Sequence, residues 1–156
     1  MPTIAVFLQN AWGELFAGKT WPRDSWLQAL QRSRSGKRLL VLEKAARGVN
    51  FYYDNTTPIC GATVDSIVKP DPKHVVDVLE SIHNLEAVVA CGKQAEATLS
   101  ELWAGKLLVV PHPAARLLKD RVYKKAGTML RNCRFDRVKL RIGRSDRILI
   151  DKLPNE

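Results

Sequence analysis

The stretch Lys106–Leu118, KLLVVPHPAARLL, decides how the fold is interpreted. Four aliphatic residues, Leu107 to Val110, end abruptly at Pro111-His112-Pro113, which is the pattern of a buried strand followed by a rigid turn. A helical pattern then resumes, so we expect a helix from Ala114 to about Tyr123. His112 would lie at the carboxyl end of a strand, where open α/β sheets bind their ligands. A structural turn with an incidental histidine is the alternative.

Apolar runs of strand length alternate with amphipathic helical patterns along most of the chain. Strands are predicted at residues 3–8, 38–42, 49–53, 86–90 and 107–110. Helices are predicted at 22–32, 71–82, 93 to near 105, and 114–123, with a loop at 14–21 and a turn at 33–37. Asp71 is the expected cap of the second helix, and Pro72 its first residue. The alternation predicts an α/β fold with three layers, α/β/α, around a mostly parallel sheet.

The length of 156 residues is that of one domain, which we divide into a core at 3–130 and a basic C-terminal extension at 131–156. Residues 131–147 contain seven Lys or Arg and only two acidic residues. Polar and apolar residues alternate at 135–142, which predicts a two-faced strand in a hairpin that turns at Gly143.

The charge of the chain favours a polyanionic partner. Lys and Arg total 25 against 16 Asp and Glu, a net charge of +9, and nucleic acid is the commonest partner of such proteins. We expect Arg137, Lys139 and Arg141, on the solvent face of the C-terminal strand, to contact DNA phosphates. An edge strand protected by charge against aggregation is the alternative.

The cysteines and the N-terminus indicate where the protein works. Cys60, Cys91 and Cys133 are widely spaced and form no Cys-x-x-Cys pair, so we expect reduced thiols and neither a disulfide framework nor a zinc or iron–sulfur site. The sequence also lacks the pattern of a signal peptide and an apolar run long enough for a membrane span. We expect a cytoplasmic, DNA-associated monomer without metal or cofactor.

Three polar corners follow three of the predicted strands: Gln9–Trp12, Asp54–Thr56 and Pro111–Pro113. The carboxyl ends of parallel strands meet at one edge of a sheet, so these corners are predicted to share a pocket. The sequence contains no Walker loop, no His-Glu-x-x-His and no Gly-x-Ser-x-Gly. Two amides, an imidazole and aromatic rings suit a planar, hydrogen-bonding base beside a group that stabilises charge.

The residues 112–116, His-Pro-Ala-Ala-Arg, resemble the closing motif of the uracil-DNA glycosylase superfamily. That motif reads His-Pro-Ser-Pro-Arg in the single-strand-selective monofunctional branch and His-Pro-Ala-Ala-Leu in the iron–sulfur branch, whose cluster cysteines this chain lacks. Residues 88–95 resemble the strand–Gly–helix stretch before the motif. Residues 8–12, Leu-Gln-Asn-Ala-Trp, align with the Gly-Gln-Asp-Pro-Tyr of one branch, and Asn10 matches the Asn-Pro-Gly of the mismatch-specific branch. Leu15–Gly18 is similar to the family's Pro-Phe-Val-Gly. The resemblance covers roughly residues 3–123.

This resemblance implies a monofunctional, metal-free DNA glycosylase that flips out uracil, or a related deaminated or modified pyrimidine, and hydrolyses its N-glycosidic bond. The implied catalytic residues are His112, which would donate a hydrogen bond to O2 of the departing base, and Asn10, which would hold the attacking water. Leu8 and Ala11 replace a family Gly and Pro. Asn10 replaces the aspartate of one branch with an amide.

The resemblance also implies residues that contact the substrate and the DNA. Phe16 would stack on the base, Asn55 would pair with its edge, and Trp12 would exclude the C5 methyl group of thymine. Gln9 belongs to the same substrate-binding set, and Arg116 would wedge into the gap that the flipped nucleotide leaves. Two other functions stay open. One is an enzyme that cleaves or exchanges bases on free nucleosides or nucleotides, and the other is a non-catalytic DNA-binding or interaction module.

Overall fold

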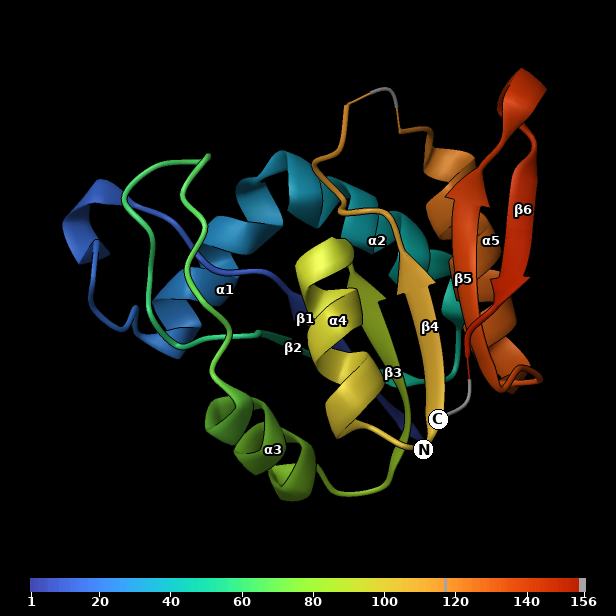
Figure 1. The fold of residues 1–156 in the computed structure, drawn as a ribbon, viewed down its shortest axis with the longest axis horizontal. Coiled ribbons are helices and arrows are strands. Elements are labelled where there is room, and N and C mark those ends of the chain that lie inside the picture. Colours follow the sequence, from blue (N-terminus) through green and yellow to red (C-terminus); the bar gives the residue numbers. More distant parts are fainter. Residues whose placement is uncertain (117, 155–156) are drawn as a thin grey trace.

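The computed structural model describes residues 1–116 and 118–154, which form a six-stranded sheet between two layers of helices (Figure 1). The strand order is β2-β1-β3-β4-β5-β6. The strands are β1 (Thr3–Leu8), β2 (Asn50–Asn55), β3 (Leu85–Cys91), β4 (Lys106–Val110), β5 (Arg137–Ile142) and β6 (Ile148–Lys152). The strands from β2 to β5 are parallel, and β6 pairs antiparallel with β5. The predicted α/β fold with a mostly parallel sheet is confirmed.

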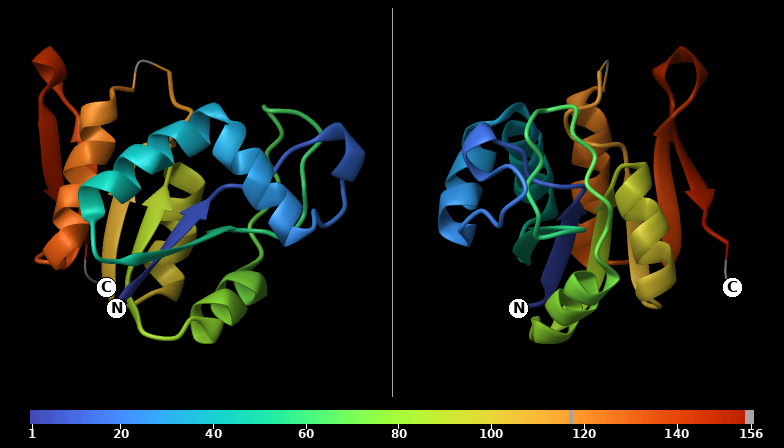
Figure 2. Two further views of the ribbon diagram at one scale, coloured as in Figure 1. Left: turned by 180° about the vertical axis from the view of Figure 1, so that it is seen from behind. Right: turned by 60° about the vertical axis from the view of Figure 1, so that its left-hand side comes forward.

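The helices cover both faces of the sheet, as Figure 2 shows. They are α1 (Arg23–Arg32), α2 (Arg34–Ala46) and α5 (Asp120–Asn132) on one face, and α3 (Pro72–Ser81) and α4 (Lys93–Leu102) on the other. In β1 the residues Ile4, Val6 and Leu8 belong to the core of the first face, whereas Ala5 and Phe7 belong to the core of the second. Burial on both faces explains why β1 is continuously apolar.

Several predicted elements are confirmed within a residue or two. The strand at 3–8 has the predicted bounds, and the side chain of Asp71 caps α3 by accepting a hydrogen bond from the His74 N–H at 3.2 Å. Pro72 is the first residue of that helix. The hairpin turns at Gly143, whose N–H donates to the carbonyl of Arg147 at 2.7 Å. The short helix η2 (Arg144–Asp146) forms the tip of this hairpin.

The strand predicted at 38–42 is wrong, because these residues lie inside α2. The predicted turn at 33–37 is instead the start of this helix: the hydroxyl of Ser33 caps it by accepting from the Gly36 N–H at 3.0 Å. Leu39 and Leu42 are buried while Leu40 is 46% exposed, which is helical periodicity. Helix α2 packs closely on α5 because residue 127 is glycine: a Cβ atom there would lie 2.4 Å from the carbonyl oxygen of Leu42.

The helix predicted at 114–123 is also wrong in position, because α5 begins at Asp120 and ends at Asn132. Leu117 lies outside the described residues, as do residues 155–156 of the predicted extension. Arg38 on α2 donates to the carbonyls of Pro113 at 3.0 Å and Leu118 at 2.8 Å. These carbonyls are therefore satisfied without a helix. The predicted loop at 14–21 includes one short helix, η1 (Glu14–Phe16).

Candidate active site

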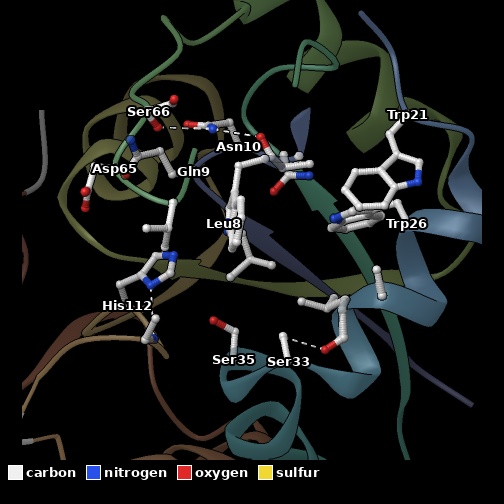
Figure 3. Close-up of a pocket in the computed structure, with 18 of the residues that line it drawn as sticks. Leu8, Gln9, Asn10, Trp21, Trp26, Ser33, Ser35, Asp65, Ser66 and His112 are labelled. Carbon is white, nitrogen blue, oxygen red and sulfur yellow. Dashed lines mark hydrogen bonds between the residues drawn. The ribbon is translucent and has the colours of Figure 1, made fainter. Parts of the chain in front are cut away.

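A cavity of about 680 Å³ lies at the carboxyl edge of the sheet, and the three polar corners converge on it (Figure 3). Among its lining residues are Gln9, Asn10, Trp12, Asn55 and His112. The second corner is tied to the first, because Thr56 donates to the Gln9 carbonyl through its hydroxyl at 2.7 Å and to the Leu8 carbonyl through its N–H at 2.9 Å. Five of the predicted catalytic and substrate-binding residues therefore share one cavity.

His112 offers a hydrogen-bond donor on the wall of this cavity. Its Nδ1 accepts a hydrogen bond from the Ala114 N–H at 3.1 Å, which assigns the proton of the neutral ring to Nε2. Burial lowers the pKa of His112 below its usual 6.5, so the ring is neutral at pH 7. Among the described residues Nε2 has no hydrogen-bond partner. A neutral imidazole with a free N–H is suited to stabilise a developing negative charge.

The corner that carries His112 is held from three sides. The buried hydroxyl of Tyr123 donates to the Pro111 carbonyl at 2.6 Å, and Arg38 holds the Pro113 carbonyl on the other side of the histidine. The third contact of the corner is with Gly92, the residue that follows β3. Its φ is 93°, and a Cβ atom at this position would lie 3.3 Å from the Cβ of His112. Glycine is needed there both for its backbone conformation and for the close approach.

The amide of Asn10 joins the first corner to the loop 62–68. Its Nδ2 donates to the carbonyls of Ala11 at 2.9 Å and Ser66 at 3.3 Å, and its Oδ1 accepts from the Val68 N–H at 3.3 Å. Both ends of the amide are thus used in holding this loop. One lone pair of Oδ1 is left to orient a water molecule.

Phe16 does not line the cavity. Its ring stacks on Trp21 instead, with centroids 5.1 Å apart and an angle of 23° between the planes. The aromatic rings in the wall are those of Trp12, Trp21 and Trp26, and Figure 3 shows the last two side by side. Trp21 was not predicted as a site residue, because the loop that precedes it is placed by its pairing with residues 59–61, which leaves no local pattern.

Asp65 is a second residue that the sequence did not indicate. It lines the cavity from the loop 62–68, together with Ser66. The Ser66 hydroxyl accepts hydrogen bonds from the N–H groups of Ala62 at 3.1 Å and Thr63 at 2.9 Å, which shape this loop. The stretch 59–68 has no clear period in the sequence, so its place above the sheet edge could not be inferred. Asp65 is exposed on this loop, and it adds an acidic residue to a lining that also includes Ser33 and Ser35.

The predicted DNA-binding residues lie outside this cavity. Arg116 is exposed and lines a second, separate cavity. Arg137 donates to the carbonyls of Ser100, Trp103 and Gly105 at 2.6–3.0 Å, at the end of α4. Lys139 pairs with Glu96 at 2.7 Å, and Arg141 pairs with Asp151. The hairpin cations therefore have partners within the protein, and their contact with phosphates stays a prediction.

Within the ranges 1–116 and 118–154, no group of three metal-binding side chains comes together. In the same part of the chain, no helix has both the length and the apolarity that crossing a bilayer requires. Comparison of the chain with protein families, with curated proteins and with solved structures found no match.

Proposed function

We propose that this protein is a monofunctional DNA glycosylase that removes uracil, or a related deaminated or modified pyrimidine, from DNA. The observation that supports it best is the neutral His112 on a cavity that also contains Asn55 and aromatic rings. The resemblance of residues 112–116 to the glycosylase closing motif agrees with this reading, and so does the net charge of +9.

In this mechanism the flipped base enters the cavity and stacks on an aromatic wall, for which Trp21 is the candidate. The amide of Asn55, only 6% exposed, pairs with the edge of the base. A base with the wrong exocyclic group would leave this buried amide unpaired, which costs about 1–3 kcal/mol. Trp12, which also lines the cavity, opposes the C5 methyl group of thymine.

The bond between C1′ and the base nitrogen breaks, and its electron pair leaves with the base. His112 donates its Nε2 proton in a hydrogen bond to O2, where the negative charge gathers. The oxygen of a water molecule then bonds to C1′, and its proton passes to the carboxylate of Asp65, which lies on the same cavity. Asn10 orients this water with its remaining lone pair and holds the loop that carries Asp65.

The test is cleavage of a uracil-containing oligonucleotide, in single and double strands, followed by hot alkali to break the chain at abasic sites. The wild-type protein is expected to give the product. His112→Ala is expected to lower the rate about 100- to 1000-fold while DNA binding is retained. The matched control is His83→Ala, an exposed histidine near the end of α3. No product from uracil, hydroxymethyluracil, hypoxanthine or deaminated guanine would overturn the proposal.

Cleavage of free nucleosides or nucleotides is the second candidate. The observation in its favour is that Arg137, Lys139 and Arg141, which were expected to contact DNA phosphates, make contacts within the protein instead. Chromatographic measurement of base release from deoxyuridine and its 5′-monophosphate separates the two candidates. Release from the free compounds at the rate seen with DNA would favour the second one.

A further inference from the structure

A second cavity, of about 590 Å³, lies beside the first along the carboxyl edge of the sheet. It is bounded by the start of α4, the ends of β4 and β5, and the corner after β4, elements that can be followed in Figure 1. His112 and Ala115 line both cavities, so that the imidazole stands in the wall between them.

The floor of the second cavity is apolar. Aliphatic residues predominate in its lining, which includes Val109, Val110, Leu140 and the half-buried Ile142. An apolar cavity of this size suits a nucleobase or another ring, because pockets of about 300–1000 Å³ hold ligands of that size.

The rim of the cavity is positively charged. Four of its six charged residues are paired: Lys139 with Glu96, which also lines the cavity, Arg141 with Asp151, and Asp146 with Lys119. Lys93 and Arg116 are exposed, and neither forms a salt bridge with any acidic residue in the described part of the chain. An apolar floor under two unneutralised cations matches a ring that is linked to a phosphate.

We propose that this cavity holds the nucleotide next to the target nucleotide in single-stranded DNA, with its base on the floor and its phosphate near Lys93 and Arg116. The inference rests on the proposed function, because the shared wall places the two bases on either side of His112. A base on this floor has left its own base pair. The substrate is therefore unpaired at two consecutive positions, and Arg116 holds a phosphate rather than filling the gap in a duplex.

The experiment measures the binding of single-stranded oligonucleotides by fluorescence anisotropy, with uracil on a 2′-fluorinated sugar that resists cleavage. Three oligonucleotides are compared: one intact, one with an abasic site on the 5′ side of the uracil, and one with it on the 3′ side. An abasic neighbour on one side is expected to weaken binding roughly five- to a hundredfold, since a stacked base is lost there. The same change on the other side is expected to have little effect. Equal affinities for all three oligonucleotides would overturn the proposal.

Two variants locate the effect. Ile142→Trp fills the cavity from β5. This variant is expected to bind all three oligonucleotides as weakly as the wild type binds the one whose abasic site weakens binding. Arg116→Gln is expected to weaken binding and to reduce the slope of log affinity against log salt by about 0.7, the value for one phosphate on a single strand. The control for charge is Arg121→Gln, an exposed arginine that does not line the cavity. If Ile142→Trp kept the wild-type sensitivity to the abasic neighbour, the subsite would not be in this cavity.

This readout is independent of cleavage. If the neighbour effect is present but no base is ever released, the subsite stands and the glycosylase proposal fails. If uracil is released but no neighbour affects binding, the glycosylase stands and the subsite is wrong. Tighter binding of the same sequence as a duplex than as a single strand would also contradict the subsite.

Discussion

The Nε2 atom of His74, on α3, lies 3.0 Å from Oδ1 of Asp54, at the carboxyl end of β2. The other oxygen of the same carboxylate pairs with Arg23 of α1 at 3.4 Å. Arg23 also donates to the Tyr53 carbonyl at 2.6 Å. One carboxylate, with 14% of its side chain exposed, thus joins a helix from each face of the sheet to the edge strand beside the candidate active site.

The pairing of His74 predicts how stability depends on pH. The hydrogen bond to Asp54 raises the pKa of His74 above its usual 6.5, against the opposing effect of burial. A raised pKa in the folded state gives stability that is fully present below pH 6.5 and is lost as the pH rises through the folded-state pKa. His74→Gln is therefore expected to destabilise the protein most at acidic pH and less as the pH rises.

Urea unfolding of the wild type and His74→Gln at several values between about pH 5.5 and 8.5 checks this expectation. His83→Gln, at an exposed histidine, is the control. A difference between His74→Gln and the wild type that stays constant over this range would contradict the assignment.

Arg38 is predicted to act as a positioning residue for His112. It donates to the Pro113 carbonyl at 3.0 Å and the Leu118 carbonyl at 2.8 Å, and pairs with Asp120 at 3.2 Å. Arg38→Gln removes this support, so the imidazole loses its fixed orientation. We expect kcat to fall about tenfold or more with little change in KM, because a small displacement of a catalytic group lowers the rate more than it weakens binding.

Steady-state kinetics on the uracil oligonucleotide separate these two effects. The matched control is Arg131→Gln, since Arg131 also donates to a backbone carbonyl, that of Ala45, at 2.9 and 3.2 Å, but does so away from the cavity. An equal loss of kcat in both variants would show that Arg38 acts on stability alone.

The lowered pKa of His112 predicts an acid limb in the pH profile of base release. Catalysis that needs the neutral ring is expected to be constant above pH 6.5 and to fall as the pH drops through the lower pKa of the folded state. Stability should fall as the pH drops from 6.5 to that lower pKa, because in this range the unfolded chain binds a proton at His112 and the folded chain does not.

NMR titration of the imidazole signals measures this pKa directly. The chain has three histidines, so the signal that disappears in His112→Gln identifies the residue. A measured pKa at or above 6.5 would contradict the lowered pKa of the buried ring.

Asn10→Asp tests whether the amide has a role that a carboxylate cannot replace. The substitution removes the Nδ2 donor and turns a carboxylate towards the carbonyl oxygens of Ala11 and Ser66. We expect the loop 62–68 to loosen, substrate binding to weaken about three- to tenfold, and kcat not to increase, since a lost hydrogen bond of this kind costs about 0.5–1.5 kcal/mol.

Hydrogen exchange of the backbone amides at 62–68, measured beside the kinetics, reports the loosening of the loop. Asn132→Asp is the control, because the Asn132 side chain accepts a hydrogen bond from Arg134 through its oxygen and a carboxylate preserves that contact. An Asn10→Asp variant with a higher kcat and unchanged exchange would show that residue 10 acts as a base.

The strands β1, β3 and β4 were predictable because burial on both faces leaves continuous aliphatic runs. The start of α3 was predictable because Asp71 and Pro72 carry its local start signal. At 38–42 the run RLLVL fits a strand as well as a helix by composition. Its contact with Gly127 of α5, which favours the helix, is tertiary and leaves no local pattern.

The residues of the candidate site also differ in whether a local sequence pattern indicates them. Asn10, Asn55 and His112 were found because each directly follows or ends a recognisable strand, and parallel strands place such residues at one edge. Trp21 and Asp65 were missed because they reach the cavity through bridges between two irregular segments, such as Trp12 with Gly61 and Ala17 with Cys60. The assignment of base stacking to Phe16 failed to anticipate that Trp21 would cover its ring.

His112 and Ala115 line both cavities, and Gly92 packs against the Cβ of this histidine. A ligand that shifts this ring from one side changes the shape of the other side as well. Binding in the two cavities is then linked by a single coupling free energy, and each ligand changes the affinity for the other by the same factor. In the proposed glycosylase, the affinity for the target base therefore depends on the nucleotide bound in the second cavity.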